Sequence, residues 1–138
     1  MRVIVVDDYR FIRRYVCTML HSTPGMEVVA EASSGEQAVA LARELRPDVV
    51  LMDISLEGMS GLAATETICR ELPEVRVVIV SRHVETEYMT HAIRIGASGF
   101  LPKSALGTEL GPALAALASG ETWFSPSILR EQIETLEI

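Results

Sequence analysis

Five polar side chains stand at or just after the ends of short apolar runs. Asp7 and Asp8 follow RVIVV, Asp53 follows DVVLM, Ser81 follows RVVIV and Lys103 comes shortly after SGFL. Carboxylates packed closely together repel one another and raise each other's pKa unless a cation joins them. Hard oxygen ligands of this kind favour Mg²⁺, which takes one or two carboxylates and leaves positions for water and a phosphoryl oxygen. The five residues together therefore predict a magnesium site that supports phosphoryl chemistry.

Each of these residues also has a plainer interpretation. A Ser or Lys after a strand is usually a solvated loop residue, and a lone Asp there is more often a helix N-cap than a metal ligand. If Asp8 only capped a helix, nothing would require Asp7 beside it or Asp53 across the sheet. Because functional sites in open α/β folds favour the carboxyl edge of the sheet, we favour the functional interpretation.

The elements that must position these residues alternate regularly. Apolar, β-branched runs predict strands at 2–6, 27–32, 48–52, 76–80 and 98–101, and apolar residues at three- and four-residue steps predict helices at about 9–21, 34–45, 61–71, 85–95 and 105–119. Crossovers too long for hairpins predict an α/β fold, a doubly wound five-stranded parallel sheet with helices on both faces. The carboxyl ends of its strands share one edge, where the polar residues would meet.

The end of the chain departs from this pattern. GETWFSP at 120–126 is expected to form a turn with exposed aromatic side chains. Ser125 as N-cap and Pro126 as the first helical residue predict an amphipathic helix beyond it, with Leu129, Ile133 and Leu136 as its apolar stripe. We therefore divide the chain into a main domain over 1–120 and a C-terminal linker and helix over 121–138.

Composition limits the remaining possibilities. A chain of 138 residues, 49% hydrophobic and 22% charged, suits one domain with a single core. Its net charge of −7 makes it a poor candidate for direct contact with DNA or RNA. The start MRVIVVDD is too short for a signal peptide or a membrane span, so the protein is expected to be cytoplasmic and away from the membrane. Cys17 and Cys69 lack metal-site or redox spacing and are expected to be free thiols.

Four motifs make the prediction more specific: VVDD at 5–8, LMDISLEGMSG at 51–61, VIVS at 78–81 and GASGFLPKS at 96–104. In this order and spacing, residues 1 to about 120 resemble the receiver domain of two-component response regulators. The resemblance implies a flavodoxin-like sheet with strand order 2-1-3-4-5. It also implies that a sensor histidine kinase is the partner and that its phosphohistidine gives a phosphoryl group to Asp53.

The resemblance assigns the metal ligands as well. Asp8 and Asp53 would bind Mg²⁺ through their carboxylates, Ser55 through its backbone carbonyl, and Asp7 mainly through water. The protein would catalyse only its own phosphorylation and dephosphorylation, so it is not expected to be an enzyme acting on other substrates.

Three further residues would form a switch. Lys103 would pair with a phosphoryl oxygen, Ser81 would swing its hydroxyl to another, and Phe100 would rotate into the vacated space. Residues 85–95 and 98–101 would then be the moving surface. The alternative for Phe100 is an ordinary core aromatic.

The stretch TELGPALAALASGETWFSPSI resembles the end of receivers in the NarL/FixJ subfamily, where a LuxR-type helix-turn-helix domain follows. Contact with DNA would then be made only through a domain absent from this chain. We expect an excised receiver rather than a natural stand-alone one. The sequence departs from the family at Glu57 and Ser104, which replace common prolines, and at Phe100, which replaces a common Tyr. Without proline, the Lys103–Ser104 bond is predicted to be trans.

Other functions remain as alternatives. A stand-alone receiver could act as a phosphate shuttle or a docking module without DNA output. A haloacid-dehalogenase-type phosphatase also uses an Asp nucleophile with Mg²⁺, but it needs a D-x-D motif that Asp7-Asp8-Tyr9 does not supply. A flavin or nucleotide binder would want a Gly-rich or hydroxyl-rich first loop, and DDYRF is the opposite.

Partner surfaces are predicted from the first helix. Its basic and aromatic residues are Arg10, Phe11, Arg13, Arg14 and Tyr15. They could bind a kinase beside the acidic residues, or the arginines could simply make the helix surface soluble in water. A homodimer could form through 9–21 and 105–119, or through the 85–119 face.

Overall fold

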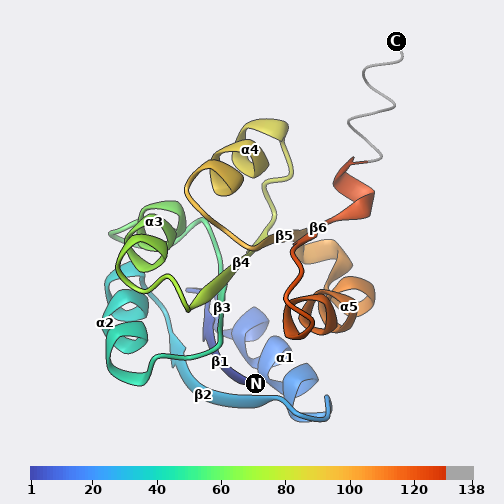
Figure 1. The fold of residues 1–138 in the computed structure, drawn as a ribbon, viewed down its shortest axis with the longest axis horizontal. Helices are drawn as coiled ribbons and strands as arrows, with labels where there is room; N and C mark the ends of the chain where they lie inside the picture. The colour runs from blue at the N-terminus through green and yellow to red at the C-terminus, as the bar shows by residue number, and fades with distance from the viewer. Residues whose placement is uncertain (130–138) are drawn as a thin grey trace.

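The computed structural model describes residues 1–129 as a twisted parallel sheet flanked by helices (Figure 1). The strands are β1 (Arg2–Val6), β2 (Glu27–Ala32), β3 (Val49–Met52), β4 (Arg76–Ser81), β5 (Gly99–Pro102) and β6 (Trp123–Phe124). The helices are α1 (Arg10–His21), α2 (Gly35–Leu45), α3 (Gly61–Glu71), α4 (Thr86–Arg94) and α5 (Leu106–Ala118), with a short 3₁₀ turn at Lys103–Ala105. All five predicted strands and all five predicted helices are confirmed.

The strand order is β2-β1-β3-β4-β5-β6, and every neighbouring pair is parallel. The first five positions are the predicted order 2-1-3-4-5. The chain starts in the middle of the sheet, fills one side with β2, and then crosses back to build the other side. This reversal of direction lies between β1 and β3, and ligand sites of open α/β sheets form at such a point.

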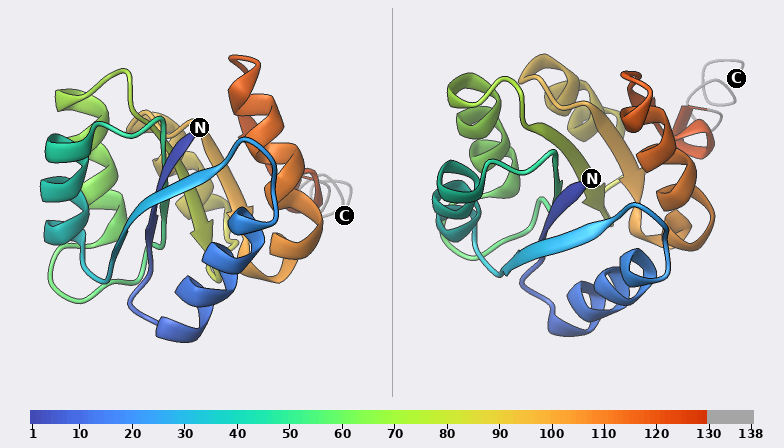
Figure 2. Two further views of the ribbon diagram at one scale, coloured as in Figure 1. Left: turned by 90° about the horizontal axis from the view of Figure 1, so that it is seen from below. Right: turned by 60° about the horizontal axis from the view of Figure 1, so that its bottom comes forward.

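The helices form one layer on each face of the sheet (Figure 2). Alternate residues of β1 serve different layers because successive side chains of a strand point to opposite faces. Val3 and Val5 join the core beneath α1 and α5, whereas Ile4 and Val6 join the core beneath α2, α3 and α4. Both faces of the central strands are therefore buried, which explains why their sequences read as continuous apolar runs.

Local signals fix where the helices begin and end. Ser34 caps α2 by accepting a hydrogen bond from the Gln37 backbone N–H at 3.2 Å. Arg46 then adopts a left-handed conformation with φ 43°, which ends the helix just before Pro47. Ser60 caps α3 in the same way as Ser34 caps α2. The helix boundaries thus follow the cap and breaker residues of the sequence.

The short strand β6 corrects one expectation. Trp123 and Phe124, expected as exposed aromatic side chains of a turn, are instead partly buried and pair with Gly99 and Phe100 of β5. Without β6, one side of β5 would present unpaired backbone groups as an open sheet edge. Trp123 packs on the α1/α5 side and Phe124 on the opposite side, so this segment closes both layers at that edge.

The chain continues from β6 into a helical turn at residues 126–129. The Ile128 backbone N–H lies 3.5 Å from Ser125 Oγ, and the Leu129 N–H donates to the Ser125 carbonyl at 3.1 Å, as expected for an N-cap at Ser125. The predicted stripe positions Ile133 and Leu136 lie outside the described residues.

Three smaller expectations can be compared with residues 1–129. Cys17 and Cys69 are free thiols. The Lys103–Ser104 peptide bond is trans, as are the other peptide bonds of the described chain. No helix within this range combines the length and apolarity needed to span a bilayer.

Candidate functional site

The sheet register brings Asp7 and Asp53 together. Val6 and Met52 are paired partners at the ends of β1 and β3, so the residue that follows each strand is also adjacent to the other. The Asp53 N–H donates to the Val6 carbonyl at 3.0 Å, and the Asp7 N–H donates to the Ala32 carbonyl of β2 at 3.0 Å. Continuation of the backbone ladder past the strand ends thus holds both aspartates at the carboxyl edge.

Three carboxylates meet there, and we call Asp7, Asp8 and Asp53 the acidic cluster. Each offers an oxygen, and the three oxygens lie within 4.8 Å of one another. Asp7 and Asp53 are each only 4% exposed, whereas Asp8 is exposed. Because all three donors are hard oxygens and one side stays open to solvent, the cluster fits a divalent ion such as Mg²⁺.

Lys103 supplies the cation that faces this cluster. Its Nζ lies 2.8 Å from Asp7 Oδ2 and 3.3 Å from Asp53 Oδ2, and its side chain is 10% exposed. It is the only lysine among the 12 basic residues of the chain. The ammonium therefore bridges two of the three carboxylates and partly offsets their repulsion.

The ionised form of Asp53 is nevertheless disfavoured. Burial raises the pKa of the Asp53 carboxyl above its ordinary value, and the neighbouring charge of Asp7 raises it further. Lys103 and a hydrogen bond from the Ser55 backbone act in the opposite direction but do not outweigh burial. The single positive charge of Lys103 therefore does not balance the negative charges of the site, and a divalent ion would balance them.

The plainer interpretation of Asp8 as a helix cap is not what the structure shows. Tyr9 is the N-cap of α1, and its helix end receives no side-chain cap. It is Asp7 Oδ1 that accepts the Tyr9 backbone N–H at 2.9 Å, and Arg13 Nη1 that donates to the Asp7 carbonyl at 2.8 Å. These contacts fix Asp7 in place, and the Asp8 carboxylate is left for the acidic cluster rather than for the helix end.

Two of the three predicted switch residues are completely buried. Ser81, the last residue of β4, and Phe100, the second residue of the neighbouring strand β5, are each 0% exposed. Ser81 Oγ accepts the His83 backbone N–H at 2.8 Å, so its hydroxyl oxygen is engaged with the loop after β4. Phe100 lies in the core beneath α2, α3 and α4.

His83 is a residue that the sequence patterns do not single out. Its Nε2 lies 3.0 Å from Ser55 Oγ, and its ring lies 5.0 Å from that of Tyr88. The contact joins the loop after β3 to the loop after β4, beside Asp53 and Ser81. Ser55 and His83 are 28 positions apart in the sequence, so no local pattern reveals this contact.

The loop after Asp53 is held by α2. Glu36 Oε1 accepts the Met59 N–H at 2.8 Å, and Gly58 takes φ +70°, a conformation that favours glycine. Glu57, which stands where the family commonly has proline, is exposed and forms an isolated bridge with Ser34. The extra negative charge of Glu57 therefore lies on a tethered loop.

The basic residues of α1 are partly neutralised. Arg13 Nε and Arg14 Nη1 pair with the two oxygens of Glu31 at 3.0 and 2.8 Å. The exposed character of the helix is aromatic instead, because Tyr9, Phe11 and Tyr15 are 59%, 79% and 50% exposed. These are the large apolar side chains that a partner would meet beside the acidic cluster.

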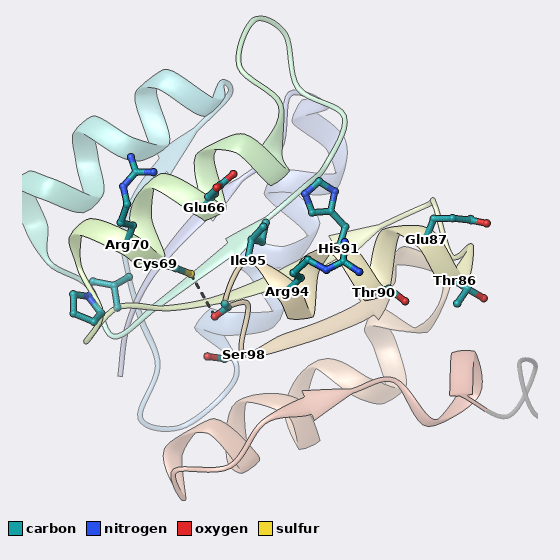
Figure 3. A pocket seen from close by; sticks show the side chains of 13 residues that line it. Glu66, Cys69, Arg70, Thr86, Glu87, Thr90, His91, Arg94, Ile95 and Ser98 are labelled. Carbon is teal, nitrogen blue, oxygen red and sulfur yellow. Dashed lines mark hydrogen bonds between the residues drawn. The ribbon is translucent and has the colours of Figure 1, made fainter.

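A separate groove of about 1040 Å³ lies between α3 and α4 (Figure 3). Its floor includes Cys69, whose thiol contacts the Gly96 carbonyl, and its rim carries Arg70, His91 and Arg94 together with two glutamates. Burial raises the pKa of the Cys69 thiol, so this thiol is not activated. None of the predicted site residues lines the groove.

Comparison with known proteins agrees with this geometry. Residues 3–115 match the family model of the response regulator receiver domain. The response regulator GacA of Pseudomonas viridiflava is 38% identical over 131 residues, 95% of this chain and 61% of the relative. The transcriptional regulatory protein LiaR of Bacillus subtilis is 37% identical over 121 residues, 88% of this chain and 57% of that protein. The chain thus spans about three-fifths of these relatives.

Solved structures extend the likeness. A LuxR-family two-component response regulator from Aurantimonas superposes with a TM-score of 0.92 and 34% identity, covering 99% of this chain and 98% of that one. The signal receiver domain of NarL from Mycobacterium tuberculosis gives a TM-score of 0.82 and 33% identity, covering 87% and 97%. These neighbours confirm the NarL/FixJ subfamily that the stretch TELGPALAALASGETWFSPSI indicates. The chain belongs to the response regulator receiver domain family.

Proposed function

We propose that this receiver accepts a phosphoryl group on Asp53 from the phosphohistidine of a sensor histidine kinase. The observation that carries the proposal is the meeting of three carboxylates with Lys103, whose Nζ contacts both Asp7 and Asp53. In the transfer, an Asp53 oxygen forms the new bond to phosphorus while the phosphorus–nitrogen bond of the phosphohistidine breaks. The electron pair of that bond stays on the imidazole nitrogen, which then takes a proton.

The residues of the chain have distinct tasks in this step. Asp8 and Asp53, with the Ser55 carbonyl and a water held by Asp7, would hold Mg²⁺. Bound there, Mg²⁺ would supply the charge neutralisation that phosphoryl transfer needs. Lys103 would move its hydrogen bonds from the carboxylates to a phosphoryl oxygen. The protein would carry out only its own phosphorylation and dephosphorylation.

The output would be a DNA-binding domain that follows the receiver. The support is that LiaR is named a transcriptional regulatory protein and that this chain spans 57% of it. Phosphorylation would then change how the receiver contacts that domain or a second copy of itself. The net charge of −7 disfavours contact between this chain and DNA phosphates, which supports DNA contact through that following domain instead.

The decisive experiment is phosphorylation by a small donor. The protein is incubated with acetyl phosphate and Mg²⁺ and its intact mass is measured, with Asp53→Asn as the matched control. We expect one labile, Mg²⁺-dependent phosphoryl group on the wild type and none on the variant. If neither acetyl phosphate nor the phosphoryl mimic beryllofluoride binds the wild type, the phosphoacceptor role is wrong and a docking module becomes the better account.

A further inference from the structure

Glu109 of α5 carries a buried carboxylate remote from the acidic cluster in sequence. It is 9% exposed and accepts hydrogen bonds from three side chains of the segment that follows α5. Trp123 Nε1 donates to Oε1 at 3.1 Å, and Ser125 Oγ and Ser127 Oγ donate to Oε2 at 2.9 and 3.0 Å. We call these four residues the Glu109 clasp.

The clasp is a network of close polar contacts. Ser125 Oγ, Ser127 Oγ and Glu109 Oε2 lie 2.8 to 3.0 Å from one another, so the two hydroxyl protons are shared among three contacts. Trp123 has a single ring donor, and that donor is used. A buried carboxylate costs free energy unless such donors replace water, and loss of Glu109 would remove the side-chain hydrogen bonds that tie the segment to α5.

The clasped segment is also joined to β5, the strand that carries Phe100. The Ser125 N–H donates to the Phe100 carbonyl at 2.8 Å, and the Trp123 N–H donates to the Ser98 carbonyl at 3.0 Å. Ile128, only 2% exposed, belongs to the same hydrophobic core as Phe100. The segment therefore contacts β5 through its backbone and shares the core of Phe100 through its side chains.

Phe100 cannot move without disturbing its neighbours. It is 0% exposed, and interiors packed at crystal-like density do not let a large ring turn into empty space. Its strand ends at Pro102, directly before the lysine that contacts Asp53. Any rearrangement of Phe100 that follows phosphorylation must therefore shift neighbouring core residues, and the clasped segment is bonded to its backbone.

Because Lys103 would leave the carboxylates for a phosphoryl oxygen, the arrangement in which it contacts Asp7 and Asp53 is the one that precedes phosphorylation. Lys103 pairs with Asp7 and Asp53, and Ser81 Oγ accepts a hydrogen bond from the His83 backbone. The Glu109 clasp is complete in this same arrangement. An interaction that is strong in one state and weaker in the other favours the first state by the difference.

We propose that Glu109 is a positioning residue of the switch: its clasp stabilises the unphosphorylated arrangement and loosens when Asp53 is phosphorylated. Residues 123–129 would thereby report the state of Asp53 to whatever follows them in the chain. This inference rests on the proposed phosphoacceptor function and adds the route by which it is regulated. Because linkage is reciprocal, weakening the clasp must make the phosphorylated arrangement easier to reach.

The affinity for beryllofluoride tests this reciprocity. Binding in the presence of Mg²⁺ is followed by ¹⁹F NMR for the wild type, Glu109→Ala and Glu44→Ala. Glu44 is an exposed glutamate of α2, so its variant is the matched control. We expect Glu109→Ala to bind roughly fivefold more tightly than the wild type, and Glu44→Ala to bind as the wild type does. Equal or weaker binding by Glu109→Ala would overturn the inference.

The fluorescence of Trp123 gives a second readout, because it is the only tryptophan of the chain. We expect beryllofluoride to change Trp123 emission in the wild type and in Glu44→Ala, but not in Asp53→Asn. A wild type that binds beryllofluoride with no change in Trp123 emission or in amide exchange of residues 123–129 would contradict the coupling. A purely structural role for Glu109 would lower thermal stability without tightening beryllofluoride binding.

Folding of the variants is checked by thermal unfolding before binding is compared. If Glu109→Ala does not unfold cooperatively, Ser127→Ala removes one exposed hydroxyl of the clasp and should tighten binding in the same direction by a smaller factor. If beryllofluoride binds no variant and not the wild type, the phosphoacceptor proposal fails and the coupling fails with it. If the wild type binds beryllofluoride but Glu109→Ala does not bind it more tightly, only the role of Glu109 is overturned.

Discussion

At the acidic cluster, the Asp53 carboxylate is subject to opposing influences. Burial and Asp7 raise its pKa, whereas Lys103 lowers it, and the net direction is upward. A carboxyl whose pKa is raised by folding contributes its full stability below its unfolded pKa and loses that contribution as pH rises through the folded pKa. At neutral pH, without a divalent ion, the ionised Asp53 therefore destabilises the fold.

Asp53→Asn should consequently stabilise the ion-free protein. We expect a gain of roughly 1 kcal/mol in unfolding free energy at pH 7 in EDTA, because the substitution removes a buried charge at nearly constant volume. Mg²⁺ should then stabilise the wild type more than the variant. Calorimetry with EDTA and with Mg²⁺ measures both, and Glu44→Gln is the surface control. A lower melting temperature for Asp53→Asn in EDTA would contradict the sign.

Lys103→Gln should act in the opposite direction. Removing a mostly buried ammonium leaves Asp7 and Asp53 without their cation, so the ion-free protein should lose about 3 kcal/mol. Mg²⁺ should bind more tightly, because no ammonium competes, while the yield of phosphoryl adduct should fall. Arg43→Gln breaks the exposed pair with Glu71 and should change the stability little. Equal losses for both variants in urea unfolding would refute the bridging role of Lys103.

Among the elements, α3 begins so close to Asp53 that its first residue must be glycine. A Cβ added to Gly61 would lie 1.8 Å from the Asp53 carbonyl oxygen, a distance that no rearrangement of a flexible side chain can relieve. The start of α3 and the position of Asp53 are therefore set together.

Gly61→Ala should displace the Asp53 backbone. We expect a loss of more than about 2 kcal/mol in stability and a large loss of phosphoryl adduct. Gly107→Ala is the matched control, since its Cβ would meet only the Tyr15 hydroxyl at 3.8 Å and alanine favours the helix by about 0.5–1 kcal/mol. Chemical denaturation and intact mass after acetyl phosphate treatment compare the two. A fully phosphorylated Gly61→Ala would show that the close approach is not needed.

The elements that were predictable from sequence are those with a local signal. Runs such as RVIVV and DVVLM predict buried parallel strands, and Ser34 predicts the start of a helix. The meeting of Asp7, Asp53 and Lys103 follows once the sheet is known, because strand ends share one edge. Strand β6 was missed because two residues cannot show a period. The Glu109 clasp and the Ser55–His83 contact were missed because they join residues 14 to 28 positions apart.

For the whole molecule, the exposed aromatic side chains of α1 define the surface most suited to a partner. Phe11 is 79% exposed, and its ring lies 6.2 Å from that of Tyr9. Exposed aromatic groups beside the acidic cluster can bury their apolar area only by association. The predicted homodimer through α1 and α5 would use this surface, whereas a dimer through α4 would use Ile93 instead.

Sedimentation velocity with Mg²⁺ and beryllofluoride distinguishes these surfaces. We expect the 15.1 kDa monomer to move toward a dimer, and Phe11→Ala to weaken the association roughly tenfold. Ile93→Ala, the truncation of a half-exposed apolar side chain on α4, should leave the association unchanged. If only Ile93→Ala weakens association, the α4 surface is the interface. A protein that stays monomeric at high concentration with and without beryllofluoride has no such dimer.

The single lysine of the chain has a practical consequence for observing this protein. Labelling with lysine that carries ¹⁵N at Nζ would place one isotopic reporter in the molecule, and that reporter lies between Asp7 and Asp53. Its ammonium resonance would follow occupation of the site without mutation or assignment. Reagents that acylate side-chain amines would likewise have one target, shielded at 10% exposure. Occupancy of the site should therefore be readable as the reactivity of one amine.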